Sequence, residues 1–395
     1  MSAVTPFRRL EQPGTATRRP LLGIDPLLLL AALGLVGCSL LTLHGVASSV
    51  GSYYWTHQAM YAGAGLALAL VISRFDYTRL REYRYFFYAV VILANLVVFG
   101  MPAHQNATRW IPLPLFQFQP SEFGKLLLIV ALAAFMVDHS RRMYERRTMA
   151  RIMLLALIPA MIVIKQPDLG TGLVYVTIAV AVLFFAGTSW KQLTALAALF
   201  IVAIALVLTV APAVGVNVLK GYQKQRLTTF LDPPTTCGSN DPTCYQLNQS
   251  LIAIGSGEKT GRGVAGATQV RFNFVPNDQD DFIFSVVGET YGFAGAALVL
   301  SLYALLIWRT LRILTMAKNL FGTLIAGCIL AMLMFQIFLN VGMTIGIMPV
   351  TGVPLPLLSY GGSSVVVTFL AIGLLQSIHA QARIASAGKA RTLIA

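Results

Sequence analysis

The sequence predicts an all-α integral membrane protein with about ten transmembrane helices. Of its 395 residues, 56% are hydrophobic and 11% are charged, and the mean hydropathy is +0.72. A soluble chain with this balance would aggregate, whereas polytopic membrane proteins have it routinely. Apolar stretches long enough to cross a bilayer also recur along the chain, with polar segments between them.

The length of each apolar stretch and its flanking residues define the candidate spans. The fifth and sixth spans, 152–166 and 170–187, are short, so they form either two crossings or one re-entrant pair. The two large external loops would be 101–119 and 215–281. The second of these loops joins the seventh span, 192–214, to the eighth, 282–308. The ten candidates are 25–44, 54–73, 84–100, 120–138, 152–166, 170–187, 192–214, 282–308, 321–341 and 363–380.

The distribution of basic residues predicts that both termini are cytoplasmic. Most of the 29 Lys and Arg residues fall on one side of the spans, as the positive-inside rule requires of the cytoplasmic side. Residues 1–24 would then be a disordered basic tail, 25–380 one transmembrane domain and 381–395 a second tail.

No cleavable signal peptide is evident, so the protein should stay in the plasma membrane. The net charge of +14 is dispersed among short loops and does not indicate nucleic acid binding.

The four cysteines divide between spans and loop. Cys38 and Cys328 lie in apolar spans, where a small inert role is expected. Cys237 and Cys244 lie close together in the second external loop, separated by turn-forming residues. Because the outside of a cell membrane permits disulfides, we expect these two to be bonded.

A first polar cluster leads from the loop 101–119 into the fourth span. It contains Arg109 and Trp110, then Glu122 and Lys125, which are three residues apart and therefore share a helical face. Lys125 lies inside the apolar segment, where an ammonium is costly unless it meets a carboxylate or a watery cavity. The pair is either a structural lock between helices or part of a cavity that receives an anionic ligand.

Three further clusters lie at the outer ends of spans. Asp168 follows Gln166 and Pro167 and either caps the next helix or serves the site. The segment 255–263 is rich in glycine and carries Lys259, but its spacing does not fit a phosphate-binding loop and it lies outside the cell, so we reject a nucleotide site. The segment 353–364, with Ser359 and Tyr360, is rich in turn formers, which at membrane depth indicates a polar groove.

Acidic residues gather where the second external loop meets the eighth span. Asp278, Asp280 and Asp281 precede the apolar run that begins at Phe282 and is long enough to span a bilayer. Charge is expensive at such a boundary. Asp281 should therefore sit at a membrane surface, at the start of a helix.

Taken in order, these clusters resemble the SEDS family of cell-wall polymerases. The resemblance covers about residues 25 to 380, and it is closer to the elongation-type members than to the division-type FtsW. It rests on Thr-Arg-Trp-Ile, Phe-Gln-Pro-Ser-Glu-Phe-Gly-Lys, Gln-Pro-Asp-Leu-Gly-Thr, Ile-Gly-Ser-Gly, Asp-Phe-Ile-Phe-Ser-Val-Val-Gly-Glu and Leu-Pro-Leu-Leu-Ser-Tyr-Gly-Gly-Ser-Ser. The chain departs from the family at Glu258, Lys259 and Thr260, and in its external cysteine pair.

The resemblance implies a peptidoglycan glycosyltransferase that polymerises lipid II, an undecaprenyl-pyrophosphate-linked disaccharide-pentapeptide. Asp281 matches the essential aspartate of the family and would act as the general base, with Asp280 as the alternative. Arg109, Lys125 and Arg226 would lie near the pyrophosphate. Glu122, Trp110, Asp168, Ser359 and Tyr360 complete the candidate substrate site.

The implied partners are a class B penicillin-binding transpeptidase and membrane proteins of the elongation complex. A divalent cation, Mg or Mn, beside Asp281 has no ligand cluster in the sequence to support it, and no other cofactor is expected. Two alternatives stay open: an FtsW-like septal polymerase and a lipid II flippase. A flippase would need charged residues along a path across the bilayer, whereas those not explained by topology gather near the outer face.

Overall fold

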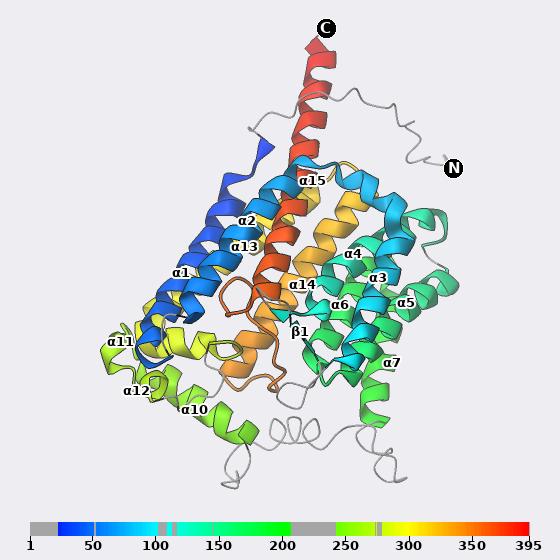
Figure 1. Ribbon diagram of the computed structural model, residues 1–395. Helices are drawn as coiled ribbons and strands as arrows, with labels where there is room; N and C mark the ends of the chain where they lie inside the picture. Colours follow the sequence, from blue (N-terminus) through cyan, green and yellow to red (C-terminus); the bar gives the residue numbers. More distant parts are fainter. Residues whose placement is uncertain are drawn as a thin grey trace.

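The computed structural model is a bundle of long helices that run in roughly the same direction (Figure 1). It describes residues 23–50, 53–101, 109–112, 117–143, 145–206, 242–272, 274 and 279–394. The long helices of this part are α1 (Pro26–Val50), α2 (Tyr53–Arg74), α3 (Arg84–Val97), α4 (Pro120–Asp138), α5 (Arg146–Lys165), α6 (Leu169–Phe185), α7 (Trp190–Ala205), α13 (Ile283–Met316), α14 (Leu320–Thr344) and α15 (Gly362–Ile394).

The long helices overlap the ten predicted spans, which confirms the all-α membrane fold; residues 207–214 of the predicted seventh span lie outside the described residues. Seven spans within the described residues are long and apolar enough to cross a bilayer by themselves. Leu169–Phe185 and Trp190–Val202 are shorter apolar helices. α2 falls in neither class, because its first turns carry Thr56, His57 and Gln58. Helix length alone therefore does not establish ten crossings.

The prediction of one continuous span from Phe282 to Trp308 was wrong. α13 is broken at Gly292, whose backbone is left-handed with a φ of 62°. A Cβ atom at this position would lie 2.3 Å from the backbone nitrogen of Gly261. The break also frees amides of the next turn: Phe293 donates to the carbonyl of Glu258 at 2.9 Å and Ala294 to that of Lys259 at 3.1 Å.

The two parts of α13 have different surroundings. Residues 283–290 are all buried inside the protein, whereas Phe293, just beyond the break, is 73% exposed. At 1.5 Å per residue, the buried part before the break is only about 12 Å long. The exposed part of α13 that can cross a bilayer therefore begins near Phe293, and the segment before it is packed inside the bundle.

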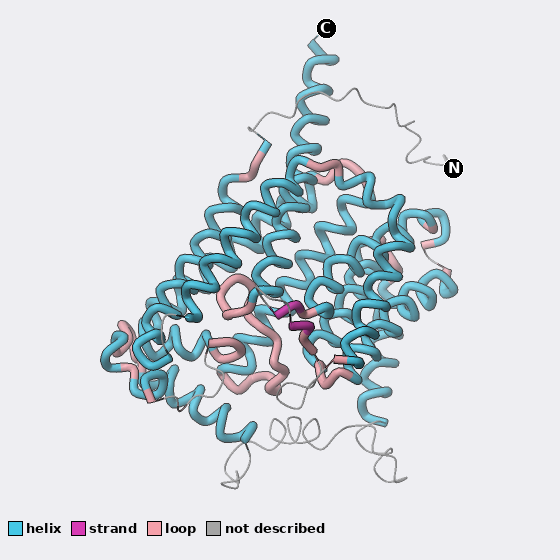
Figure 2. The backbone as a smooth tube through the Cα atoms, in the orientation of Figure 1, coloured by secondary structure: helices cyan, strands magenta, loops and turns pink. Residues whose placement is uncertain are grey.

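Short elements link the long helices. At the end of the bundle opposite to the one where α15 leaves it, the 3-10 helix η3 (Val98–Gly100) ends α3. There, the antiparallel strands β1 (Ile111–Pro112) and β2 (Gln117–Phe118), of two residues each, precede α4, and the helices α10 (Pro242–Ser256), α11 (Gly263–Gly266) and α12 (Thr268–Arg271) precede α13. At the other end lie the 3-10 helices η2 (Tyr77–Tyr83) and η4 (Ser140–Arg142). Figure 2 shows the hairpin beside the irregular segment that leads into α15.

Glycines allow α2 and α15 to pack closely at the centre of the bundle. A Cβ atom at Gly373 would lie 2.8 Å from the carbonyl oxygen of Ala69, and one at Gly65 would lie 2.7 Å from the ring of Phe369. Such contacts let the two backbones approach more closely than larger residues would permit. The pair holds the start of α15, which borders the candidate site, in a fixed place.

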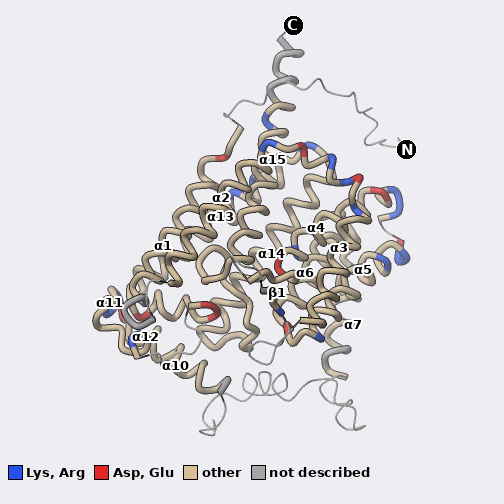
Figure 3. The backbone as a smooth tube through the Cα atoms, viewed as in Figure 1, with Lys and Arg blue, Asp and Glu red and all other residues tan. Residues whose placement is uncertain are grey.

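A buried ion pair ties three helices together at the end of the bundle where α15 leaves it. Arg309 of α13 pairs with Asp25, which is fully buried. Gln376 of α15 accepts from the Asp25 amide at 2.7 Å and donates to its carbonyl at 3.0 Å. From its position after an apolar span, Arg309 is expected to be a topogenic cation, but Asp25 neutralises its charge inside the protein. Many of the other Lys and Arg residues gather at this same end, and a few lie near α11 and α12 at the opposite one (Figure 3).

Candidate functional site

Asp281 lies in a turn just before α13, at the level of the last turn of α14. Its backbone carbonyl accepts a hydrogen bond from Asn340 Nδ2 at 2.9 Å, and the same amide group donates to Val353 at 2.8 Å. The residue that caps α13 is Phe282, whose side chain makes no capping bond. The Asp281 side chain is half-buried. Asp278, the first carboxylate of the predicted cluster, lies outside the described residues.

The segment between α14 and α15, residues 345–361, is irregular backbone held by buried side chains. Ser359 Oγ accepts from the amide of Leu355 at 2.8 Å, and Tyr303 donates to the carbonyl of Pro356 at 2.6 Å. Gln58 of α2 donates to the carbonyl of Ser359 at 3.0 Å and also reaches Ser39 of α1 at 3.1 Å. Irregular backbone at this depth is tolerated because the protein itself satisfies its polar groups.

Tyr360 connects this segment to the Asp281 turn. Its amide donates to the carbonyl of Gln279 at 2.9 Å, and Gln279 Nε2 lies 3.4 Å from the hydroxyl of Tyr54. The rings of Tyr54 and Tyr360 meet edge to face, with centroids 4.8 Å apart. The structure therefore brings the predicted residues Tyr360 and Asp281 into one region, and it adds Tyr54 from α2.

Gln119 connects the first polar cluster, which contains Glu122 and Lys125, to the same region. Its amide nitrogen donates to Ser363 Oγ at 2.9 Å, in the first turn of α15, and Ser363 in turn donates to the carbonyl of Gln117 at 3.0 Å. The side chain of Gln119 reaches Asp168 Oδ2 at 3.3 Å. Clusters far apart in sequence thus meet around the start of α15.

Asp168 is a buried cap with a second set of partners. Its Oδ1 atom accepts from the amide of Thr171 at 3.1 Å, which caps α6, while Ser121 lies 3.4 Å from Oδ2. Gly170 brings this turn against the segment before α15, because a Cβ atom there would lie 2.3 Å from the side chain of Val353. Of the two predicted roles, capping is confirmed.

Arg109 holds the turn between α5 and α6. Its guanidinium donates to the carbonyl of Gln166 at 3.2 Å and to that of Pro167. Trp110 follows it and is half-buried. The side chain of Gln166 in turn donates to the carbonyl of Asn95 at 2.6 Å. Arg109 therefore supports the backbone around Asp168 in this conformation.

The pairing of Glu122 with Lys125 is confirmed. Lys125 Nζ lies 2.5 Å from Glu122 Oε2, and both side chains are 2% exposed. The pair is enclosed by the protein instead of facing an open cavity, which differs from one of the two expectations. Lys125 lies about 8 Å along α4 from Pro120. The carboxylate of Glu122 offsets the free-energy cost of burying the ammonium there. Glu122 Oε1 is buried without a hydrogen bond.

The glycine-rich segment 255–263 is structural. A Cβ atom at Gly257 would lie 1.8 Å from the carbonyl oxygen of Gly288, and Gly261 has a φ of 83° and packs on the carbonyl of Thr290. Arg262 donates its amide to the carbonyl of Glu289 at 2.9 Å. These glycines therefore let the loop pack on the buried start of α13, in keeping with the rejection of a nucleotide site.

Sequence reasoning missed several polar residues that build the site, namely Gln58, Gln119, Gln279 and Asn340. Gln58 and Asn340 are amide side chains that interrupt apolar helices, and both are fully buried. A buried amide must find hydrogen-bond partners, so an isolated Asn or Gln in an apolar span is the signal that could have identified them.

Cys244 is disulfide-bonded, whereas Cys38 and Cys328 carry free thiols. Its expected partner, Cys237, and the expected cation Arg226 lie outside the described residues.

We predict that replacing both Cys237 and Cys244 by Ser lowers thermal stability slightly and leaves a substantial part of the activity. A short closed loop gives only about 2–3 kcal/mol in the chain-entropy model. Mass spectrometry of nonreduced, alkylated protein checks the bond. An alkyl label on both thiols would show that they are not joined.

Within the part of the chain that the structure describes, no three His, Cys, Asp or Glu side chains lie close enough together to hold a metal ion.

The chain matches the model of the FtsW, RodA and SpoVE cell cycle proteins over residues 22–384. It is 33% identical over 381 residues to the peptidoglycan glycosyltransferase MrdB of Escherichia coli (strain K12), which covers 95% of this chain and 99% of the relative. It is 33% identical over 431 residues to the peptidoglycan glycosyltransferase RodA of Treponema pallidum (strain Nichols), covering 90% and 98%. A probable peptidoglycan glycosyltransferase FtsW of Thioalkalivibrio sulfidiphilus (strain HL-EbGR7) is 34% identical over 372 residues, covering 90% and 89%.

Solved structures are similar along nearly the same length. A chain of a peptidoglycan synthase complex, described as coordinating polymerization and crosslinking, superposes with a TM-score of 0.77 at 30% identity, covering 91% of this chain and 99% of that one. The rod shape determining protein RodA of Thermus thermophilus superposes with a TM-score of 0.66 at 27% identity, covering 91% and 97%.

Proposed function

The chain belongs to the family of FtsW, RodA and SpoVE cell cycle proteins and is a peptidoglycan glycosyltransferase; from this premise we propose that it polymerises lipid II with Asp281 as the general base. Glycosyl transfer needs a base to take the proton from the attacking sugar hydroxyl. The observation that carries the assignment is the convergence of the polar clusters on the turn of Asp281. That turn is fixed through its backbone by Asn340 and Tyr360.

Transfer also breaks the bond between the donor sugar and undecaprenyl pyrophosphate, and the charge that develops on this leaving group must be stabilised by cations or backbone amides. We assign Lys125, Arg109 and Arg226 to this role. Lys125 is enclosed together with Glu122 in this conformation, so this role requires the surrounding side chains to move when substrate enters. An ammonium has three donors, so one can stay on Glu122 while another meets a phosphate oxygen. Arg109 would exchange its carbonyl partners for the substrate or position the turn around Asp168.

A lipid-linked substrate also needs an apolar surface beside the reacting centre. A cavity of about 320 Å³ between α1 and α13 is lined mostly by apolar side chains, including Leu41, Val287 and Leu298. Val287 lies six residues after Asp281, about 9 Å along the helix. This placement favours a substrate with a sugar headgroup at Asp281 and a hydrocarbon chain that runs down the bundle.

We further propose that both termini face the cytoplasm, so that Asp281 works on the outer side of the plasma membrane. The gathering of Lys and Arg at the end where α15 leaves the bundle supports this orientation (Figure 3). Of the alternatives, a septal FtsW-like role keeps the same chemistry. The similarity to RodA and MrdB along the whole chain favours the elongation role. A flippase is disfavoured, because the two buried ion pairs lie near the two ends of the bundle instead of along a path across it.

The partner we infer is a class B penicillin-binding transpeptidase, within a complex that holds further elongation proteins. The similarity to a chain of a complex that coordinates polymerization and crosslinking supports this inference.

Purified protein given fluorescent lipid II, with and without such a transpeptidase, tests the proposed function. We expect a ladder of glycan strands on a gel. Unchanged lipid II with the partner present, from protein that is folded and inserted, would refute it, and lipid II moved across a vesicle membrane without polymerisation would favour the flippase.

A divalent cation fits this site only together with substrate. Mg²⁺ is usually held by one or two carboxylates plus the phosphates of a ligand. Asp280 and Asp281 would supply the carboxylates for Mg or Mn, and the substrate would supply the phosphates. We predict that a chelator lowers the polymerisation rate and that added Mg or Mn restores it, while the thermal stability of the substrate-free protein is unchanged. Full activity in excess chelator would contradict this role.

A further inference from the structure

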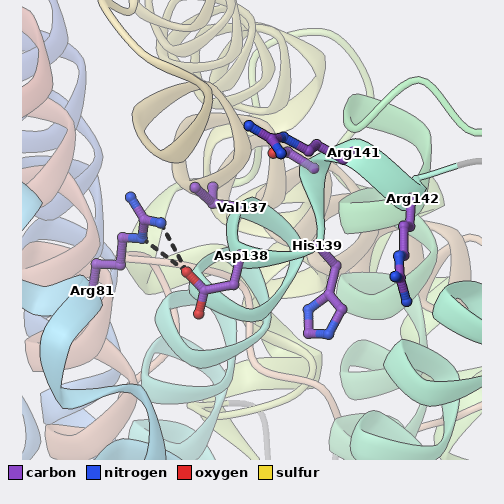
Figure 4. Close-up of a pocket in the computed structure, with 7 residues that line it drawn as sticks. Arg81, Val137, Asp138, His139, Arg141 and Arg142 are labelled. Carbon is purple, nitrogen blue, oxygen red and sulfur yellow. Dashed lines mark hydrogen bonds and ion pairs between the residues drawn. The ribbon is translucent and has the colours of Figure 1, made fainter. Parts of the chain in front are cut away.

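A pocket at the basic end of the bundle is separate from the site around Asp281. It has a volume of about 490 Å³ and is formed where α4 ends and η4 follows, with η2 on the opposite side. Figure 4 shows Arg81 reaching Asp138 on one side, Arg142 beyond His139 on the other, and Arg141 above Val137 between them. Val137 and Ser140 complete the lining.

The charges around this pocket do not balance. Asp138 is shared by two guanidiniums, with Arg81 at 2.8 Å and Arg84 at 3.1 Å. Arg142 lies 3.7 Å from Glu145, and both side chains are more than half exposed, so this pair contributes little. Arg141 has no ion-pair partner within the described ranges. Four arginines therefore face two carboxylates.

The pocket lies at the boundary between apolar and polar surface. The apolar run of α4 ends at Asp138. One turn earlier, the ring of Phe135 meets that of Tyr85, with centroids 5.3 Å apart, and Tyr85 and its neighbour Phe86 are each 62% exposed. Exposed aromatic rings are enriched at membrane interfaces, where one part of the ring meets hydrocarbon and another the headgroups.

We propose that this basic pocket binds the phosphodiester headgroup of an anionic phospholipid, with its acyl chains along the exposed apolar faces of α3 and α5. The guanidiniums supply a charge and a fork geometry that suit phosphate oxygens. Leu93 of α3 and Leu154 of α5 are 61% and 58% exposed, so hydrocarbon can cover them. A soluble anion would meet the same arginines but would leave this apolar surface uncovered.

The test measures lipid retention by native mass spectrometry of the full chain in mixed micelles with phosphatidylglycerol or phosphatidylcholine. We expect selective retention of phosphatidylglycerol, and the pair of substitutions Arg141→Gln and Arg142→Gln should weaken it by about tenfold or more. The matched control is Arg312→Gln with Lys318→Gln, which removes the same charge from exposed positions at the same end of the bundle. Equal losses in both variants would overturn the proposal and leave only a diffuse charge effect.

A second variant is expected to increase lipid retention instead of lowering it. Asp138→Asn removes the carboxylate that competes for Arg81 and Arg84, so retention of phosphatidylglycerol should rise. No rise, or a fall, in folded protein would contradict the proposal. Displacement of the lipid by millimolar inorganic phosphate, or by poly-glutamate, would instead indicate a site for a soluble anion or for an acidic peptide.

Discussion

Replacement of Asp281 by Asn is expected to lower the rate of glycan polymerisation by about 10² to 10⁴-fold, the range that general-base catalysis typically contributes. The amide cannot accept the proton of the attacking hydroxyl but has nearly the same size. The turn is held through the backbone carbonyl of Asp281 and capped at Phe282, so the side-chain change should leave the fold intact. Lipid II consumption and the unfolding temperature, measured on the same preparation, check both parts.

The neighbouring carboxylate provides the matched control. Asp280→Asn changes the same net charge one residue away, and we expect it to retain far more activity than Asp281→Asn. Near wild-type synthesis by folded Asp281→Asn protein would remove Asp281 from its assigned role. If Asp280→Asn alone abolished synthesis, the base would be Asp280.

The second large effect is expected from Lys125→Ala. It leaves the carboxylate of Glu122 buried without a counter-charge, and breaking such a pair typically costs about 3–5 kcal/mol. It also removes the cation that we assign to the pyrophosphate. Thermal stability in detergent and polymerisation rate should therefore fall together.

A paired replacement separates these two contributions. Glu122→Gln with Lys125→Met removes both charges at once, so most of the lost stability should return. Polymerisation should nevertheless stay low, because no cation is left to meet the pyrophosphate. Full activity in this double variant would mean that the pair serves only to hold α4 in place.

Much of the fold follows from length and composition alone. The fourth span was predicted at 120–138 and α4 occupies those residues, because Pro120 favours the first turn and the apolar run ends at Asp138. The pairing of Glu122 with Lys125 also followed from their spacing, since residues three apart share a helical face.

The break in α13 could not be predicted in this way. Gly292 sits in an apolar run that a helix would tolerate, and its left-handed backbone is fixed by Gly257 and Gly261, which lie more than thirty residues earlier. Similarly, Arg309 has the sequence setting of a topogenic cation. Only the packing of α1 against α13 and α15 reveals that Asp25 neutralises it.

In the candidate site, too, the sequence predicts some residues but not the contacts between them. Asp281, Asp168 and Tyr360 stood out because polar residues at the ends of apolar spans are costly. The hydrogen bonds that gather them run through Gln119, Gln279 and Asn340, whose partners are distant in sequence. Pairwise contacts of this kind depend on tertiary structure, so sequence patterns indicate the members of the site but not its connections.

The central claim is that Asp281 acts on the chemical step and not on substrate binding. Single-turnover measurement with Asp281→Asn protein and fluorescent lipid II tests it most directly, by recording the amount of lipid II bound and the rate of the first glycosidic bond separately. Our account predicts binding near the wild-type level and a bond-forming rate lower by at least about a hundredfold. Weakened binding with an unchanged rate on the bound substrate would contradict it.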